Sequence, residues 1–267
     1  MINNMTMLIL SCDAFSDLWD GHVKMLEKNW PDRDMPTYIV TDAPTDKKYN
    51  NVKILSAGAE CEWSDRLAFA LEHVKTDYVF ITLDDYFLIK KVESKGIFDL
   101  TDIMKVEGID YLRLFKRPKR LTLSEIPGYG KIYRIDTSRS YGVNLYSGIW
   151  KKSFIEYCTK KPLSAWKFEV SLYKRAVEYG AKGAVSRRNE FVILDVVRKG
   201  KLLRKAARYF KKHPGIYEGD RPVNTRRYEF KLTVQQQLSR HLPTPVKNKL
   251  KAFLTKHGKE FYSNGAE

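Results

Sequence analysis

Short apolar runs alternate with helical patterns through the first part of the chain, and this alternation limits the fold more than any other feature. Four strand-like runs occur before residue 84, and two segments with the spacing of a helix face lie between them. The order strand, helix, strand, strand, helix, strand favours right-handed crossovers and a sheet covered on both faces. We therefore predict an α/β fold with a mostly parallel sheet flanked by helices. The predicted strands are 5–10, 37–40, 52–55 and 78–83, and the predicted helices are 16–29, with Ser16 as N-cap, and 64–74.

The second part of the chain has a less regular pattern. Residues 191–194 form its last strand-like run before a basic segment begins at Arg198. We predict one domain over residues 1–197 and a basic helical C-terminal extension over residues 198–267. The other predicted elements are strands at 111–115 and 143–150, a loop at 116–120, a hairpin or irregular excursion at 126–135, and helices at 153–159, 166–179, 202–210 and 246–254. Phe168, Leu172 and Val177 are expected on the inner side of the helix at 166–179.

Positive charge is concentrated at the C-terminal end. The net charge is +16 over 267 residues, and residues 198–267 alone carry +13, with 18 basic and 5 acidic residues. Such a segment attracts polyanions, which means either nucleic acid or an anionic membrane surface. A nucleic-acid-binding protein is therefore the alternative function. We expect no nucleic acid as partner, because the sequence has no zinc-finger spacing or aromatic RNA-binding motif, and its acidic residues follow the predicted strands.

Several classes of protein are excluded by simple counts. The longest apolar runs are far shorter than the roughly 20 residues that span a bilayer. The N-terminus has neither the basic region nor the cleavage site of a secretory signal. Three cysteines lie far apart and form no Cys-x-x-Cys pair, which indicates reduced thiols. We therefore expect a cytoplasmic protein, peripheral on the inner face of the cell membrane if the basic segment binds lipid.

Aspartate follows three of the predicted strands. Asp13 and Asp42 come after the first and second strands, and Asp84 and Asp85 directly follow the strand at 78–83. In an open parallel sheet, ligands bind beyond the carboxyl ends of the strands. Adjacent carboxylates repel each other, and a divalent cation such as Mg²⁺ or Mn²⁺, shared with a diphosphate, compensates them. The alternative is that these residues are helix caps or solvated turns.

Together these segments resemble the nucleotide-sugar half of GT-A (Rossmann-like) fold glycosyltransferases. The resemblance is based on the strand ending in Thr41-Asp42, on Trp63-Ser64-Asp65-Arg66-Leu67 opening a helix, and on residues 78–88. It implies that residues 1–90 bind the donor, a UDP-sugar, with Asp13 and Asp84 among its contacts and with Asp42, Asp65 and Arg66 around the uracil and ribose. It also implies that Asp84 and Asp85 hold Mn²⁺ or Mg²⁺. Tyr86 stands where the third position of the Asp-x-Asp motif has an acid. Asp65 and Arg66 have the alternative roles of a helix N-terminal charge and a surface ion pair.

Residues 91–197 resemble the acceptor half of bacterial capsule and surface-polysaccharide transferases of this fold. The relevant segments are 143–154 and 162–169, where Trp166 precedes Glu169 by a few residues in what we expect to be the first turn of a helix. In inverting members of the family the corresponding acid is the general base, so the resemblance implies that role for Glu169. A carboxylate beside a pocket can take the proton of an attacking hydroxyl. The alternative is that Glu169 only complements the helix dipole.

The basic segment supplies further candidates. His213 is a candidate third metal ligand or phosphate donor, and Arg198 and Lys201 are candidates to neutralise the leaving diphosphate. The resemblance implies transfer from a UDP-sugar to a glycan or lipid-linked glycan acceptor in surface-polysaccharide synthesis, with inversion. A metal-dependent nucleotidyltransferase would share the carboxylates, but the sequence contains no Gly-rich phosphate loop.

Overall fold

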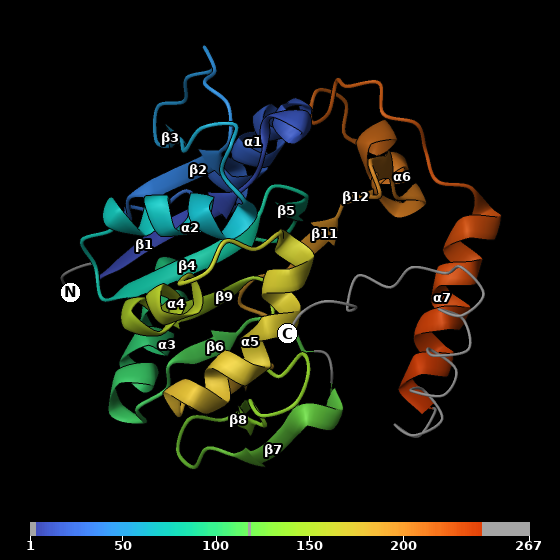
Figure 1. Ribbon diagram of the computed structural model, residues 1–267. Helices are drawn as coiled ribbons and strands as arrows, with labels where there is room; N and C mark the ends of the chain where they lie inside the picture. Colours follow the sequence, from blue (N-terminus) through green and yellow to red (C-terminus); the bar gives the residue numbers. More distant parts are fainter. Residues whose placement is uncertain (1–3, 117–118, 242–267) are drawn as a thin grey trace.

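The computed structural model describes residues 4–116 and 119–241, and its centre is a nine-stranded sheet (Figure 1). The spatial order of the strands is β3-β2-β1-β4-β9-β6-β10-β8-β7. Their bounds are β1 Met5–Leu10, β2 Thr37–Thr41, β3 Lys53–Ser56, β4 Tyr78–Leu83, β6 Tyr111–Arg113, β7 Thr122–Glu125, β8 Ile132–Ile135, β9 Gly148–Lys151 and β10 Gly183–Ser186. Two small sheets flank it, pairing β5 (Tyr86–Leu88) with β11 (Ile193–Asp195) and β12 (Val197–Arg198) with β13 (Lys201–Leu202).

Strand direction confirms the predicted α/β fold with a mostly parallel sheet. The strands β1 to β4 run parallel to one another, and β9 is antiparallel to both β4 and β6. Because β10 is parallel to β6 and β8 is antiparallel to both β10 and β7, seven of the nine strands run in one direction. The chain passes from β1 outward to β2 and β3 and then returns to β4 on the other side of β1. The strand order therefore reverses between β1 and β4, which is where open α/β sheets bind ligands.

Helices cover both faces of the sheet (Figure 1). On one face α1 (Trp19–Asn29) and α3 (Ser94–Val106) bury apolar side chains, and on the other α2 (Trp63–Glu72), α4 (Lys152–Cys158) and α5 (Ala165–Tyr179) do so. Strand β1 contributes to both cores, because Met7 and Ile9 face the first and Leu8 and Leu10 face the second. Burial on both faces explains why the run at 5–10 is continuously apolar rather than alternating.

The first predicted helix is divided in two. A 3₁₀ helix, η1 (Asp13–Leu18), comes before α1, with Cys12 and Leu18 in the two N-cap positions. The expectation that Ser16 caps the helix is therefore wrong, because the chain already turns from Asp13 and Ser16 lies inside η1. Of the two possibilities predicted for 126–135, the structure has the hairpin, but it starts earlier than predicted, because its first strand is β7 at Thr122–Glu125 and only β8 lies within 126–135. A second 3₁₀ helix, η2 (Lys119–Leu121), lies in the segment predicted as a loop.

The strand predicted at 143–150 is shorter than expected. Strand β9 begins only at Gly148. The backbone before Gly148 makes hydrogen bonds with the Asn144 side chain instead of with a neighbouring strand. Asn144 Oδ1 accepts hydrogen bonds from the backbone N–H of Tyr146 and from the Tyr111 hydroxyl, and Asn144 Nδ2 donates to the carbonyl of Tyr141 at 3.0 Å. Residues 141–147 thus form an ordered loop at the edge of the sheet.

The basic segment begins with an element that packs on the body. Helix α6 (Arg204–Lys212) buries Ala206 and Phe210 against Leu18, Met25 and Phe87, so its apolar stripe faces protein. Helix α7 (Arg226–His241) stands apart from the sheet in Figure 1, and its Phe230 is 71% exposed. The helix predicted at 246–254 lies outside the described residues.

Candidate active site

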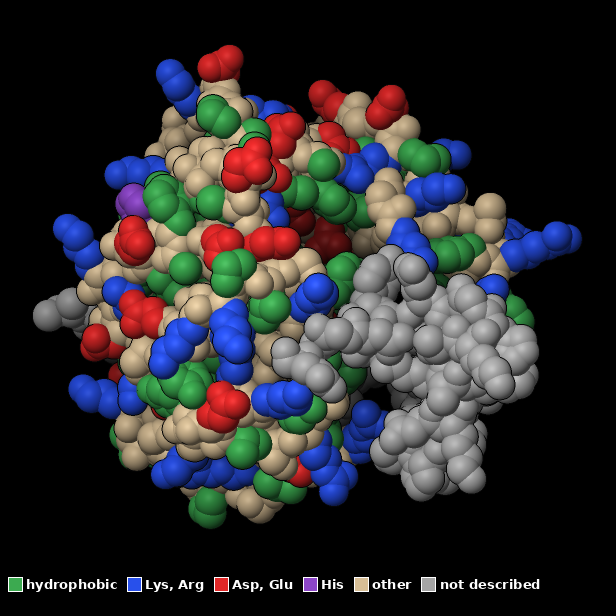
Figure 2. All heavy atoms as spheres, in the orientation of Figure 1, with side chains coloured by type: hydrophobic (Ala, Val, Ile, Leu, Met, Phe, Trp, Pro, Cys, Tyr) green, Lys and Arg blue, Asp and Glu red, His purple; other side chains and the backbone are tan. Residues whose placement is uncertain are grey.

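Loops from both halves of the sheet meet at one edge. The carboxyl ends of β1, β4, β6 and β10 share this edge with the amino end of β9, because β9 runs in the opposite direction. Figure 2 shows a hollow there, close to β5 and β11, with acidic side chains at its floor and apolar side chains on its wall. This hollow is the candidate active site.

Asp84 is fixed by side chains from the first strand and helix. It is 6% exposed, and its Oδ2 accepts a short hydrogen bond from the Ser11 hydroxyl, whose oxygen accepts from Trp19 Nε1 at 2.7 Å. The buried His22 ring lies with Nδ1 3.0 Å from the Asp84 carbonyl oxygen, and burial lowers the pKa of His22 to about 4. His22 is therefore neutral at pH 7 and donates from Nδ1. Burial raises the pKa of Asp84, while the Ser11 hydrogen bond opposes this shift.

Asp85 has a second carboxylate beside it that sequence reasoning missed. Strand β5 pairs with β11, and the backbone N–H of Val196 donates to the Asp85 carbonyl at 2.9 Å, which brings Asp195 close. Burial and then the charges of Asp84 and Asp195 raise the pKa of Asp85, and burial also raises that of Asp195. In the sequence Asp195 directly follows the apolar run 191–194, as Asp84 follows the run 78–83, so the same signal was present. In the structure Asp195 is the last residue of β11.

Each of these two carboxylates has one oxygen atom that accepts no hydrogen bond from the described residues. Asp85 Oδ1 and Asp195 Oδ1 are both buried and have no hydrogen-bond partner among the described residues. Hard oxygen donors of this kind fit Mg²⁺ or Mn²⁺. Within residues 4–116 and 119–241, however, no three His, Cys, Asp or Glu side chains converge into a group that could hold a metal ion. His213 lies exposed in the C-cap position of α6, where its ring contacts the Tyr209 ring at a tilt, with centroids 4.3 Å apart.

The predicted nucleotide contacts form a group beside β1 and β2. Asp42 accepts a hydrogen bond from the backbone N–H of Asp13 at 2.7 Å and an ion pair from Arg66 Nη1 at 3.1 Å. Although burial acts in the opposite direction, these contacts lower the pKa of Asp42. Cys12 joins this group to Asp84, since the charges of Asp84, Asp42 and Arg66 all act on its thiol. The structure thus brings Asp13, Asp42 and Arg66 together near Asp84.

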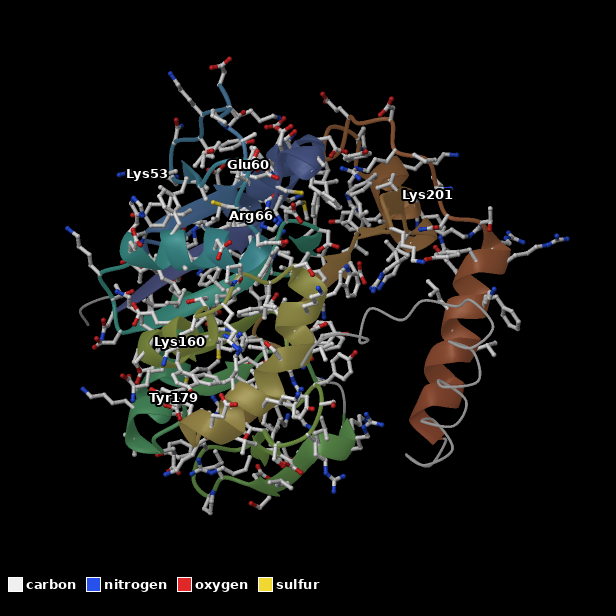
Figure 3. The ribbon with its side chains drawn as sticks, in the orientation of Figure 1. Lys53, Glu60, Arg66, Lys160, Tyr179 and Lys201 are labelled. Atoms are coloured by element: carbon white, nitrogen blue, oxygen red, sulfur yellow. The ribbon has the colours of Figure 1, made fainter. Side chains whose placement is uncertain are left out.

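Two predicted residues have other surroundings. Asp65 accepts from the backbone N–H of Glu62 at 3.2 Å in a capping box that starts α2, and it makes no hydrogen bond or ion pair with the other candidates. Lys201 lies exposed on β13. In Figure 3, Arg66 and Lys201 are seen on opposite sides of the hollow of Figure 2.

Glu169 lies on α5, beside the loop that comes before β9. Helix α5 begins at Ala165, so Glu169 lies in its second turn, and the expectation of a first-turn position is wrong. The helix starts earlier because Ser164 takes the N-cap position. A helix-dipole role is weaker at this distance from the N-terminus. Burial raises the pKa of Glu169, while the backbone N–H of Leu145, 3.3 Å from Oε1, and the charge of Arg198 oppose the shift.

Two arginines connect the parts of the site. Arg198 Nη2 lies 2.6 Å from Asp195 Oδ2, and the same guanidinium acts electrostatically on Glu169 and Asp85. Arg221, which the sequence analysis did not single out, holds Asp17 through Nε at 2.7 Å and Nη2 at 2.6 Å. Its charge also acts on Asp84. Nothing local in the sequence identifies Arg221, because its partner lies about two hundred residues away.

No model of a known protein family matches the chain, and no curated protein matches it. Solved structures align with most of it at low identity. TarS 1–349 of S. aureus in complex with UDP-GlcNAc is 13% identical with a TM-score of 0.46, and the alignment covers 74% of this chain and 60% of that one. Glucosyl-3-phosphoglycerate synthase from Mycobacterium tuberculosis, in complex with Mn²⁺, UDP and phosphoglyceric acid, is 12% identical with a TM-score of 0.47, covering 73% and 71%.

A third aligned structure is CMP:2-keto-3-deoxy-manno-octonic acid synthetase complexed with CTP. It is 12% identical with a TM-score of 0.43, covering 79% of this chain and 97% of that one. This chain spans less than two thirds of the TarS chain. At this identity, the similarity to these structures is one of fold alone. Among the described residues, no helix combines the length and apolar character needed to cross a bilayer.

Proposed function

We propose that the protein is a glycosyltransferase that moves a sugar from a UDP-sugar donor to a glycan or lipid-linked glycan acceptor. The observation that carries this proposal is the buried pair Asp85 and Asp195, with Asp84 next to Asp85, near the point where the strand order reverses. A nucleoside diphosphate and a divalent cation together satisfy such carboxylates. Arg198 pairs with Asp195 and its charge also acts on Glu169, a carboxylate whose raised pKa suits proton abstraction.

The donor would bind along the edge of β2, β1 and β4. Asp42, Arg66 and Asp13 would contact the uridine, and Asp85 and Asp195, with their unpartnered oxygens, would hold Mn²⁺ or Mg²⁺ close to Asp84. The cation, when bound, supplies positive charge to the diphosphate. Ser11 and His22 keep Asp84 in place for this role.

The acceptor would bind on the side of Glu169. Glu169 takes the proton of the acceptor hydroxyl as that oxygen bonds to the anomeric carbon and the bond to the diphosphate breaks. The diphosphate leaves with the electron pair of that bond, and Arg198 stabilises its negative charge. A single displacement of this kind inverts the anomeric configuration.

Surface-polysaccharide synthesis is the setting that we propose, with the enzyme peripheral on the inner face of the cell membrane. The exposed cations of α6 support this setting, since its Lys205, Arg208, Lys211 and Lys212 face away from the protein and make no ion pair within the described residues. A lipid-linked acceptor is presented at an anionic membrane surface, and each Lys or Arg near such a surface contributes about 1 kcal/mol.

The donor site is tested by thermal unfolding with a panel of nucleoside diphosphates, each with and without Mn²⁺. UDP with Mn²⁺ should raise the Tm, because a ligand that binds only the native state at 100 times its Kd adds about 2.7 kcal/mol of stability. Asp85→Asn and Asp195→Asn should lose the Mn²⁺-dependent part of the shift. Asp85→Asn should fold at least as well as wild type, since it removes a buried negative charge. Asp195→Asn also loses the ion pair with Arg198, so its Tm without ligand should be lower and its shift is measured from that value.

A matched control is Asp99→Asn, which removes a carboxylate of the same kind from an exposed ion pair with Lys95 on α3. This variant should keep the full shift. The proposal is wrong if no nucleoside diphosphate raises the Tm of the wild type. The metal assignment is wrong if Asp85→Asn and Asp195→Asn respond to Mn²⁺ as Asp99→Asn does.

A further inference from the structure

Two arginines at the acceptor end of the sheet carry charge that no carboxylate of the described chain balances. Arg113, the last residue of β6, is 0% exposed, and its Nε and Nη2 have no hydrogen-bond partner among the described residues. Its Nη1 reaches only the Tyr141 carbonyl, at 3.4 Å. Arg187 follows β10 and is half-buried, and its guanidinium lies over the Tyr133 ring, 4.5 Å from the centroid. Its Nε is buried without a hydrogen-bond partner there, while its Nη2 donates to Thr122 Oγ1 at 2.9 Å.

These two positive charges lie close enough to repel each other. Burial lowers the pKa of the Arg113 guanidinium, and the charge of Arg187 lowers it further, although Tyr111 and Tyr146 oppose the shift. Neither arginine makes an ion pair within residues 4–116 and 119–241. A buried cation without a counter-ion costs several kcal/mol, and buried polar groups left unpaired in native proteins need an explanation. An oxyanion bound at Arg187 would balance the charge of both guanidinium groups.

The position of this pair suits an acceptor. Strands β4 and β6 are separated only by β9, so at about 4.8 Å per strand Arg113 lies roughly 10 Å across the sheet from Ile81, three residues before Asp84. Tyr111 and Tyr146 each interact electrostatically with both Glu169 and Arg113, so these two tyrosines connect the arginine to the proposed base. A molecule whose hydroxyl reaches Glu169 could therefore extend a charged group toward β10.

The loops around the pair are fixed by their own contacts. The backbone N–H of Arg187 donates to the Lys131 carbonyl at 2.9 Å, and Arg188 Nε donates to the Gly130 carbonyl at 2.9 Å. Lys131 and Asn189 both adopt left-handed backbone conformations, with φ of 58° and 69°. Figure 2 shows further Lys and Arg side chains over the lower part of this face, around β7 and β8. The site is thus preorganised and positively charged.

We propose that Arg113 and Arg187 recognise an anionic group, a phosphate or a carboxylate, carried by the acceptor. This inference rests on the proposed function and names the chemical class of its acceptor. The partly exposed Arg187 makes the contact, and Arg113 adds a second positive charge from behind it. A neutral sugar offers nothing that would balance these charges, so the acceptor is an acidic glycan or a sugar phosphate rather than a neutral one.

The test is calorimetric titration of the full chain saturated with UDP and Mg²⁺, so that the donor side is occupied. Inorganic phosphate and glucuronate are the two anionic probes, and glucose is the neutral control. At least one anion should bind, and the stronger of the two identifies the group. Arg187→Gln and Arg113→Gln should each weaken its binding tenfold or more while UDP binds as in wild type.

Arg226→Gln is the matched control, because it removes the same charge from an exposed position on α7, which stands apart from the sheet in Figure 1. It should bind the anion as wild type does. The inference is overturned if neither anion binds, or if Arg226→Gln weakens binding as much as Arg187→Gln. Arg187 lies in a loop and is only half-buried, so Arg187→Gln should fold. This variant alone decides the test if Arg113→Gln does not fold. Failure of UDP to bind wild type would instead contradict the proposed function.

Discussion

Glu169 illustrates how neighbouring residues prepare one side chain for chemistry. It is close enough to raise the pKa of three tyrosines, Tyr111, Tyr141 and Tyr146, and its own hydrogen bond is a single long one from the backbone. A carboxylate surrounded by rings and weakly solvated is a stronger base than one in water. Its basicity is therefore a property of its surroundings and not of the helix on which it lies.

Replacement of this carboxylate gives a direct prediction. Glu169→Gln keeps the shape of the side chain but cannot accept a proton, so kcat should fall by roughly 10²–10⁴ with UDP binding unchanged. In wild type, activity should be lost as the pH falls through the pKa of Glu169, which lies above its usual 4.5, because only the ionised form is a base. Kinetics of both proteins over a range of pH check this.

Glu178→Gln, on the exposed side of the same helix, is the control and should turn over as wild type does. A Glu169→Gln enzyme with unchanged kcat, or a product that retains the anomeric configuration, would contradict the role of the base.

At the scale of residues, the sequence predicted side chains that come directly after strands and missed those that arrive from elsewhere. Asp84 and Asp85 were found because an apolar run ends at them. Asp195 also follows an apolar run, but it was missed because the basic segment begins three residues later. Arg113 and Arg221 could not be predicted, since their importance depends on partners that are absent or distant in the chain.

Among the elements, α1 depends on a glycine for its contact with the C-terminal segment. A Cβ added at Gly21 would lie 1.9 Å from the carbonyl oxygen of Ile216, a residue buried against α1 and β5. Lys24 Nζ also donates to the Gly215 carbonyl at 2.9 Å. The close approach of the backbone is thus what allows residues 215–217 to pack beside the donor site.

We predict that Gly21→Ala destabilises the protein by about 1–3 kcal/mol, as overpacking does. Gly96→Ala, in α3, is the matched control, because nothing lies within 4 Å of its added Cβ. Restricting the unfolded chain should make that variant about 0.4–1 kcal/mol more stable than wild type. Urea unfolding measures both changes in the free energy of unfolding. Equal stability of the two variants would contradict the prediction that the close approach of Ile216 excludes a side chain at position 21.

The boundaries of helices and strands were predicted well where apolar periodicity alone determines them. They were predicted poorly where a side chain, rather than a neighbouring strand, makes hydrogen bonds with the backbone. The strand at 78–83 is found as predicted, whereas Asn144 shortens β9 from its predicted start at residue 143. In α5, Phe168 and Leu172 face the core as expected. Val177 is 57% exposed and Ala176 is buried in its place, because the helix continues the four-residue spacing.

Over the whole molecule, the distribution of charge leads to a prediction about membranes. Because the apolar side chains of α6 pack against α1 and β5, only its Lys and Arg side chains are available to contact a membrane. The protein should co-sediment with vesicles that contain anionic lipid and be released as salt rises. A chain ending at Pro245 lacks five further lysines and should lose most of this binding. Equal binding to neutral vesicles, or no binding at low salt, would contradict it.

At this scale the fold class was predictable from the sequence, and the packing of the basic segment on the rest of the chain was not. Apolar runs and helix periods specify an α/β sheet, but the charge change at Arg198 predicts only composition. Whether the segment packs depends on Phe210 and Ala206 meeting Phe87, which is a tertiary contact.

The position of β9 also affects how the chain is made. Strand β4 has its final partner on one side only after β9 has been synthesised, about seventy residues later. At the usual 5–20 residues per second, the ribosome needs several seconds for that interval. During it, the hydrophobic edge of the newly made donor half has no strand beside it, and such open edges attract other chains. A holding chaperone during translation would therefore protect this protein most between the emergence of β4 and that of β9.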